Sequence, residues 1–477
     1  MTLIMTVNEI PDDVWLEIFD IDRLSKPDHC QWKWDRLAHV CRKWRQLIFA
    51  SPLRLKLRIL CKSGTPVRKN LGIWPPFPLI VHYDDYRRGI KIGDEDNVIA
   101  ALEHPDRLYR VCLDTKKLSS RSLGKIIAML QKPCPILTCL SIVATDNRNV
   151  LPAGFLGGSA PCLQRFRLYG IPFPALPTLL LSASNLSDLI LKDIPPAGYT
   201  PPQKMVLYLA TLPKLNTLRL GFQTVTTHSA RILAQPIKRT VLPSLCELTF
   251  SGIFQYLEDL VAQIDTPLLN SLNIYYVDQG IEFEVLQLSQ FLDRSEVLVK
   301  TLSDKCEITL SDDHVYLDIF GPGPWDSNEV GAISVGIGCE GTGQKVSQLT
   351  NLLSGITPII PDMVHFSFEI DLAITDPYYM EESVNWYELF SQFPSVQTML
   401  VGGSATGHIS FALGDMMYLC RMDGVPDLLP ALELICILND DPPNCFHAFL
   451  SFRQDAGYPV TYIWDLEDFE KRKSCII

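Results

Sequence analysis

Three glycines in the C-terminal half have a spacing that could bind a nucleotide. Gly336, Gly338 and Gly341 fit G-x-G-x-x-G between a strand-like run and a helix-like run, a pattern that lets the backbone approach a pyrophosphate. No βαβ half precedes them, and the residues up to Lys345 lack the G-K-(S/T) ending of a phosphate-binding loop. The favoured interpretation is a glycine-rich turn, and a nucleotide-binding enzyme using the Gly336–Gly341 loop is a remote alternative.

Four residues near the N-terminus could bind zinc: His29, Cys30, His39 and Cys41. Their spacing matches none of the paired ligand patterns, and Cys41 also falls on the apolar face of an expected helix. No G-x-S-x-G, H-E-x-x-H or kinase-like string occurs in the chain. We therefore expect no metal, no cofactor and no enzymatic activity.

A third group of candidate residues is basic and aromatic. Guanidinium groups pair well with carboxylate and phosphate, and arginine and tyrosine often dominate binding interfaces. The group comprises Arg165, Arg167, Tyr169, Lys192, Arg219 and Tyr275. If the fold places them on one surface, they predict a docking site for an acidic or phosphorylated protein segment; the alternative is a solvated face whose charges bind nothing specific.

Composition excludes several classes of protein. The 477 residues carry a formal net charge of −12, which argues against a general nucleic-acid binder. Residues 1–75 hold 13 Lys and Arg against 8 Asp and Glu, whereas the remainder holds 29 against 46. The 14 cysteines stand singly in apolar runs, as in a reduced protein. With neither a signal peptide nor a membrane-spanning run, we expect a cytoplasmic or nuclear protein that contacts no membrane.

The elements that must position these residues begin with two expected helices. Pro11, Asp12 and Asp13 are helix-start signals, and Val14, Ile18 and Phe19 follow at helical spacing. After a loop with the Trp-rich run HCQWKW, a second amphipathic segment repeats apolar residues every three or four positions: Leu37, Val40, Cys41, Trp44, Leu47 and Ile48. One interpretation is a small bundle packed on the rest of the chain, but about fifty residues bury little apolar surface among themselves.

This segment, Ile10 to Ile48, resembles an F-box, a module of packed helices that docks a Skp-type adaptor and through it a cullin ubiquitin ligase. The shared order is (L/I)-P-x-(D/E)-(V/I), then I-F, then V-C-(R/K)-x-W-R-x-L. The resemblance implies adaptor binding or F-box core positions for Ile10, Pro11, Val14, Ile18, Phe19, Val40, Cys41, Trp44 and Leu47. Ile10 stands where leucine is commoner, a nearly volume-conserving change.

Beyond the F-box-like segment, a proline-led apolar triplet recurs. Its positions are Leu137/Leu140/Ile142, Leu163/Phe166/Leu168, Leu186/Leu189/Leu191, Leu215/Leu218/Leu220, Leu245/Leu248/Phe250 and Leu269/Leu272/Ile274. The first leucines are 26, 23, 29, 30 and 24 residues apart, and five of the six triplets follow a proline two residues upstream. Helix-like stretches lie at 119–131, 200–212, 226–235 and 254–264. Each repeat therefore predicts a short parallel strand and a returning helix.

Similar apolar spacing, less regular than in the six triplets, extends toward both ends of the chain. Upstream strands are expected around Leu57, within 77–83 and around Val111; downstream strands are expected at Phe366, Met399 and Ile435. Residues 295–345 are the exception, because CEITLSDDHVYLDIF alternates like a hairpin of unassigned register. We expect an α/β fold with the F-box-like domain at 1–50 and an irregular solenoid at 51–477, with parallel strands on the concave face and helices outside.

The repeats resemble the irregular leucine-rich repeats attached to F-boxes, including the large F-box families of mushroom-forming fungi. Where regular repeats place asparagine, this chain has Thr145, Ile171, Ile194, Gln223, Ile253 and Val277. The alternative is an ordinary α/β sheet with proline-led strands. Residues between the triplet positions would line the exposed sheet face, which places the six basic and aromatic candidates there. The expected function is a substrate-recognition adaptor of a ubiquitin ligase with an unidentified protein client; the alternative is a non-degradative scaffold.

Overall fold

Parallel strands alternating with helices make up both units into which the chain divides. The computed structural model describes residues 10–24, 37–50, 57–61, 64–73, 76–83, 94–116, 118–145, 148–174, 176–223, 238–277, 285–321, 332–339, 341–371, 385–403, 413, 429–437 and 444–463. Unit 1 comprises Met1–Thr200 and Thr211–Leu215, and unit 2 comprises Pro201–Ala210 and Asn216–Ile477. The predicted α/β class is confirmed by a large, mostly parallel sheet, and the predicted boundary at residue 50 falls inside unit 1.

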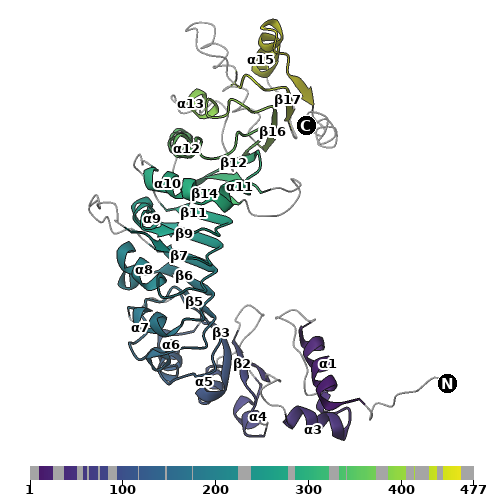
Figure 1. Cartoon of the computed structure of the whole chain (residues 1–477), viewed down its shortest axis with the longest axis vertical. Coiled ribbons are helices and arrows are strands. Elements are labelled where there is room, and N and C mark those ends of the chain that lie inside the picture. Colours follow the sequence, from purple (N-terminus) through teal and green to yellow (C-terminus); the bar gives the residue numbers. More distant parts are fainter. Residues whose placement is uncertain are drawn as a thin grey trace, which may run out of the picture. The chain divides into compact units, whose positions relative to one another are not determined.

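Unit 1 alternates parallel strands with helices (Figure 1). Its strands pair in sequence order, β1 with β2 and so on to β6. The strands are β1 (Leu57–Leu60), β2 (Leu79–Tyr83), β3 (Leu108–Asp114), β4 (Cys139–Val143), β5 (Arg165–Tyr169) and β6 (Asp188–Ile194). The helices are α1 (Asp12–Leu24), α3 (Arg42–Ala50), α4 (Val67–Ile73), α5 (Asp94–Leu102), α6 (Ser120–Met129) and α7 (Leu176–Ser182).

Unit 2 has the strand order β7-β9-β11-β14-β13-β12-β15-β16-β17-β18, with a small parallel pair of β8 and β10 beside it. The strands are β7 (Thr217–Phe222), β8 (Thr240–Val241), β9 (Glu247–Gly252), β10 (Ile264–Asp265), β11 (Ser271–Tyr276), β12 (Lys305–Ser311), β13 (His314–Ile319), β14 (Ile333–Gly338), β15 (His365–Asp371), β16 (Thr398–Gly403), β17 (Leu434–Ile437) and β18 (Thr461–Ile463). The helices are α8 (Pro202–Leu209), α9 (Phe254–Val261), α10 (Leu286–Arg294), α11 (Glu296–Lys300), α12 (Thr342–Ile356), α13 (Trp386–Phe390) and α15 (Asn444–Asp455).

The apolar triplets form the core of each unit, as the sequence predicts. Within unit 1, Leu140, Phe166 and Leu189 lie in register on neighbouring strands. Within unit 2, Leu248 and Leu272 do the same. All eighteen triplet side chains are buried. Alternate residues of a strand point to opposite faces of the sheet, so the residues between them line the face away from the core.

The prolines ahead of the triplets have a structural role in turns. In the turn before β4, the N–H of Leu137 donates to the carbonyl of Cys134 at 3.2 Å, which places Pro135 second in a four-residue turn. The same bond closes the turns that end at Leu163, Leu186, Leu215, Leu245, Leu269, Val396 and Leu432. Proline favours the second position of such turns because its ring fixes φ near −65°. The recurring proline therefore marks the turn into most of these strands; the turn that ends at Leu186 has Ser184 in the second position.

The irregular region at 295–345 contains a hairpin, as expected, and the structure supplies its register. Strand β13 runs antiparallel to both β12 and β14, while β12 pairs parallel with β15 and β14 pairs parallel with β11. The chain thus inserts one reversed strand into an otherwise parallel arrangement. Residues 322–331 and 340 of this region lie outside the described residues.

The helices expected from the repeat are present where the structure describes them, with one exception. Helices α6, α8 and α9 match the predicted stretches, and the stretch 226–235 lies outside the described residues. Between β4 and β5 a short 3-10 turn at Phe155–Gly158 replaces a helix. Figure 1 shows α5, α6 and α7 along one side of the unit 1 strands, and α8, α9, α10 and α12 along one side of the unit 2 strands.

At two of the six positions where regular repeats place asparagine, other groups make hydrogen bonds. Near the end of β4, the hydroxyl of Thr145 donates to the carbonyl of Lys116 at 3.1 Å, and the hydroxyl of Thr115 donates to the carbonyl of Val143 at 2.7 Å. The N–H of Val277 donates to the carbonyl of Gly252 at 3.1 Å, and this bond continues the backbone hydrogen bonding one residue past β11. Backbone groups at these turns are satisfied without an asparagine ladder.

Candidate functional site

An aromatic cluster joins the two N-terminal helices of unit 1. The ring centroid of Trp44 on α3 lies 4.7 Å from that of Trp15 and 4.9 Å from that of Phe19, both on α1. Leu47 and Ile48 are buried beside them. Lys43 reinforces the pairing, because its Nζ donates to the carbonyl of Ile10 at 2.8 Å and lies 3.3 Å from Asp12.

The nine residues to which the F-box resemblance assigns a role differ in how deeply they are buried around this cluster. Phe19 and Leu47 are buried, Trp44 and Ile10 are half-buried, and the other five are exposed: Pro11, Val14, Ile18, Val40 and Cys41. Sequence reasoning missed Trp15, which is 8 % exposed and lies four residues before Phe19 on the same helix face. That i, i+4 spacing was the available signal.

The exposed members include large aliphatic side chains. Val14 is 43 % exposed, Ile18 42 % and Val40 59 %, and Ile21, at the next turn of α1, is 63 % exposed. Their spacing on α1 puts Val14, Ile18 and Ile21 on one helix face. We call these three residues of α1, together with the exposed Val40 in the turn before α3, the apolar strip. Exposed aliphatic residues that share a face are typical of a surface that binds a partner.

The second N-terminal helix differs from the expected continuous segment. Residues 37 and 38 are helical, but the helix is interrupted at His39–Cys41 and α3 begins at Arg42. Cys41 was expected on the apolar helix face; instead it is exposed, and its Sγ accepts a hydrogen bond from the N–H of Trp44 at 3.4 Å. A side chain that accepts from the first turn takes the role of a helix cap, which explains why periodicity alone misplaced it.

In unit 1, the predicted client-binding residues of β5 and β6 lie on the sheet face away from the core. Arg165 and Arg167 alternate with the buried Phe166 and Leu168, and Tyr169 pairs with Lys192 on the neighbouring strand. None of the four predicted residues is fully buried. Arg219 and Tyr275, the other two predicted residues, belong to unit 2.

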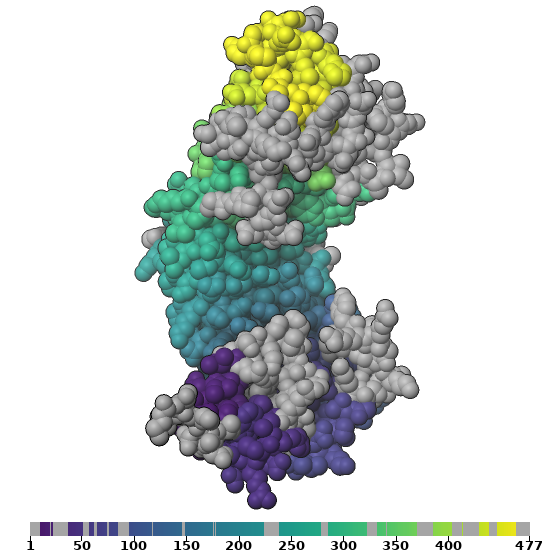
Figure 2. Space-filling view, turned by 90° about the vertical axis from the view of Figure 1, so that its right-hand side faces the viewer, coloured from purple at the N-terminus to yellow at the C-terminus, as the bar shows by residue number. Residues whose placement is uncertain are grey.

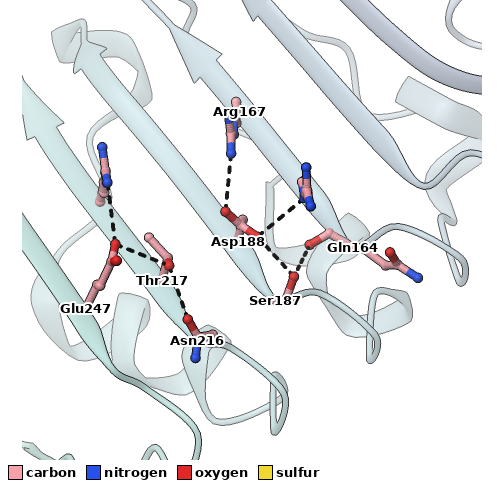
Figure 3. A network of polar contacts seen from close by, with 9 residues as sticks. Gln164, Arg167, Ser187, Asp188, Asn216, Thr217 and Glu247 are labelled. Atoms are coloured by element: carbon pink, nitrogen blue, oxygen red, sulfur yellow. Dashed lines mark hydrogen bonds and ion pairs between the residues drawn. The ribbon is translucent and has the colours of Figure 1, made fainter. Parts of the chain in front are cut away.

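A shared carboxylate holds both arginines of β5 (Figure 3). The Nε of Arg165 lies 3.8 Å from one oxygen of Asp188, and the guanidinium of Arg167 lies 3.3 Å from the other. The hydroxyl of Ser187 also donates to Asp188 at 3.0 Å. Asp188 offsets one of the two positive charges and orients both guanidinium groups, so this site is less basic than the sequence suggests.

Two further arginines lie on this face and were missed. The register aligns Arg58, Arg110, Cys139, Arg165 and Asp188 in one row across the strands of unit 1, with Ile80 between the first two. Extending the alternation rule to the upstream strands would have identified both arginines. The basic face of unit 1 therefore consists of Arg58, Arg110, Arg165, Arg167 and Lys192.

Two cysteine thiols lie within this basic face. Cys112 on β3 hydrogen-bonds to Cys139 on β4, and this bond, together with the nearby arginines, lowers the pKa of Cys139 despite its burial. The same bond and burial raise the pKa of Cys112. Cys112 pairs in register with Ser141, so the two cysteines are diagonal neighbours. Both thiols are free.

In unit 2, Arg219 also pairs with a carboxylate of the next strand. Its guanidinium lies 3.4 Å from Glu247, which accepts a hydrogen bond from Thr217 at 3.4 Å; Thr217 also contacts the side chain of Asn216 (Figure 3). The pair is half-exposed, and exposed ion pairs contribute little to stability. Its effect is to orient the arginine and to neutralise it.

The glycine-rich string forms the expected strand, turn and helix. Gly341, with φ of +76°, precedes α12, and Gly336 lies within β14. A Cβ on Gly336 would lie 2.8 Å from the Tyr275 ring and 2.9 Å from the Tyr316 ring. Side-chain packing therefore explains this glycine. Lys345 is 2 % exposed and donates its Nζ to the carbonyl of Asp312 at 2.7 Å.

The described residues hold no metal-ligating cluster of His, Cys, Asp and Glu. Of the four residues considered for zinc, His29 and Cys30 lie outside the described residues, and His39 and Cys41 are exposed. In the part of the chain that the structure describes, no helix has the length and apolarity to cross a membrane. A comparison with protein-family models found no match to this chain, and a search of curated proteins found none either.

Proposed function

We propose that this chain is a substrate-recognition adaptor of a cullin-type ubiquitin ligase. In this account the N-terminal helices are an F-box that docks a Skp-type adaptor, and the strand-and-turn units are irregular leucine-rich repeats that bind a protein client. The chain itself catalyses nothing: the bound ligase transfers ubiquitin, and the chain supplies proximity between ligase and client.

The apolar strip is the observation that supports this proposal best. Trp15, Phe19 and Trp44 hold the two helices together, so Val14, Ile18 and Val40 are not needed for that core. Fully burying an aliphatic side chain of this size contributes about 1.5–3 kcal/mol. Four such side chains against a partner would provide much of a stable interface. The order of residues that resembles an F-box identifies the expected partner.

Adaptor binding can be tested with variants that spare the helix core. Ile18→Glu/Val40→Glu places charges in the apolar strip and should weaken co-elution with a purified Skp-type adaptor by about tenfold or more. Ile73→Glu/Leu181→Glu is the matched control, because both side chains are exposed on other helices of unit 1. Equal co-elution of both double variants would contradict the proposal.

The basic face of unit 1 is the proposed site for an acidic or phosphorylated segment of the client. Arg165→Ser/Arg167→Ser should reduce recovery of clients in affinity purification, whereas Arg121→Ser/Lys132→Ser removes two exposed charges elsewhere in unit 1 and should not. Clients that accumulate when the cullin is inhibited would be degradation substrates. Clients that bind without accumulating would instead favour the non-degradative scaffold.

A further inference from the structure

Three rings form an aromatic platform on the sheet face of unit 2: Tyr275 on β11, and His314 and Tyr316 on β13. The His314 centroid lies 5.2 Å from that of Tyr275 and 5.8 Å from that of Tyr316, with a 27° angle to the latter. Both tyrosines lean over Gly336 on the strand between them, where a side chain would collide with them. All three rings are partly exposed, and the His314 side chain is 19 % exposed.

Hydrogen bonds fix the central ring of the platform. The Nδ1 of His314 lies 2.5 Å from Asp313, and its Nε2 contacts the hydroxyl of Tyr275. If Nδ1 donates its proton to the hydrogen bond with the Asp313 carboxylate, the imidazole is neutral, and its Nε2 accepts a hydrogen bond from the Tyr275 hydroxyl. Burial and the nearby Lys345 lower the pKa of His314, which favours this neutral form. The platform is therefore held in place before any partner arrives.

Three carboxylates lie beside the platform on the same face, together with Lys305 of β12. Glu307 and Asp318 lie directly opposite each other on β12 and β13, and Glu369 lies on the neighbouring β15. Burial raises the pKa of both Glu307 and Asp318, and the adjacent acids raise that of Glu307 further. Like charges directly opposite on paired strands destabilise a sheet.

Within the described residues, these carboxylates have hydroxyl partners rather than cationic ones. Thr309 hydrogen-bonds to Glu307, and Ser334 hydrogen-bonds to Asp318. Among the described residues of unit 2, Lys and Arg form ion pairs at Arg219–Glu247, Arg294–Asp265 and Lys300–Glu296, and His314 contacts Asp313. Two unfavourable features thus occur side by side: partly exposed aromatic rings and half-buried like charges. One type of group relieves both, an organic cation with an apolar stem.

We propose that this face of unit 2 binds a cationic protein segment whose arginine or lysine side chains lie on the Tyr275 and Tyr316 rings and pair with Glu307 and Asp318. A guanidinium or ammonium group is attracted to the face of a tyrosine ring. The same group would offset the repulsion between the carboxylates. Nucleic acid would be repelled by these acids.

This surface rests on the client-binding half of the proposed function, but it involves neither the apolar strip nor an adaptor, so its failure would leave adaptor binding untouched. Figure 2 looks onto the side of the strands away from α8 and α9, where atoms of unit 2, in teal and green, reach the surface. The strand face of unit 1 is rich in arginine, whereas the part of the unit 2 face formed by β11–β15 is mainly aromatic and acidic. A client that binds both must carry segments of opposite charge.

Fluorescence anisotropy with two labelled nine-residue peptides tests the inference on the full chain. One peptide alternates glycine with arginine and the other alternates glycine with glutamate. The arginine peptide should bind saturably and about tenfold or more tighter than the glutamate peptide. Glu307→Gln/Asp318→Asn and Tyr316→Ala should each weaken its binding about fivefold or more.

The matched control is Asp293→Asn/Glu296→Gln, which removes two exposed carboxyl charges from α10 and α11 and should change affinity less than about twofold. The carboxyl double variant should fold as well as the wild type, because it removes a like-charge pair. No saturable binding of the arginine peptide, equal binding of the glutamate peptide, or an equal loss in the control would overturn the inference. Adaptor co-elution should be unchanged in every one of these variants.

Discussion

Glu258 shows how a single buried carboxylate links two helices of unit 2. It is 5 % exposed on α9 and accepts the N–H groups of Gln287 at 2.6 Å and Leu288 at 2.9 Å, in the first turn of α10. Burial raises its pKa to about 7, although the two N–H groups favour the charged form. Desolvation of the carboxylate outweighs the helix-capping bonds.

This balance predicts a pH-dependent stability. The pKa of Glu258 is about 7 in the folded state and 4.5 in the unfolded state. Between these two pH values the folded chain therefore binds the proton of Glu258 more tightly than the unfolded chain does. The free energy of unfolding should therefore fall as pH rises through this window, on the order of 1–3 kcal/mol more in the wild type than in Glu258→Gln. Chemical unfolding at intervals from pH 5 to pH 8 measures the difference. Parallel pH profiles for the two proteins would rule out this role for Glu258.

Gly336 provides a second prediction at the residue scale. Gly336→Ala should destabilise unit 2 by about 1–3 kcal/mol, because the new methyl group collides with two tyrosine rings that lie over the strand. Gly72→Ala is the control, since a Cβ there meets no atom within 4 Å. Thermal unfolding should show a lower midpoint for the first variant only. An unchanged midpoint would show that the tyrosines can move aside at no cost.

At the scale of elements, the apolar triplets were predictable and the ion pairs were not. Leu140, Phe166 and Leu189 follow a spacing that selects one face of a strand, so periodicity alone predicts their burial. Asp188 was visible in the sequence, but its contact with both Arg165 and Arg167 depends on register between strands. Periodicity within one strand carries no information about register with the next.

The N-terminal helices also show what apolar periodicity can and cannot predict. The helix-start signals at Pro11 and Asp12 predicted α1, which begins at Asp12. The break before α3 was not predictable from apolar spacing, because Cys41 satisfies that spacing and yet caps the helix. In the hairpin region, alternation predicted strands β12 and β13, whereas the parallel pairing of β12 with β15 involves residues far apart in the chain.

The proline-led turns support a prediction about the repeating element. Pro267→Ala should lower the free energy of unfolding by about 0.4–1 kcal/mol, because alanine leaves the unfolded chain more conformational freedom while the turn geometry stays the same. The N–H of Leu269 should still donate to the carbonyl of Thr266 in the variant. Urea unfolding of the two proteins gives the difference. A variant as stable as the wild type would mean that the turn does not depend on proline.

At the scale of the whole molecule, charge separates along the chain. The sequence is basic before residue 75 and acidic after it. The described strand faces differ as well, with arginines on β1, β3 and β5 and carboxylates on β12, β13 and β15. Net charge alone suggested a uniformly acidic body. The distinction between the faces required knowing which residues alternate with the core, which the strand assignments provide.

The proposed adaptor role depends most on one interaction, the docking of the N-terminal helices on a Skp-type adaptor. Calorimetric titration of the purified full chain with a Skp-type adaptor tests it most directly. We expect a one-to-one complex with a Kd of about 1 μM or tighter, equivalent to roughly 8 kcal/mol of binding free energy, and a Kd about tenfold or more weaker for Ile18→Glu/Val40→Glu. No binding by the folded wild-type chain, or undiminished binding by that variant, would contradict it.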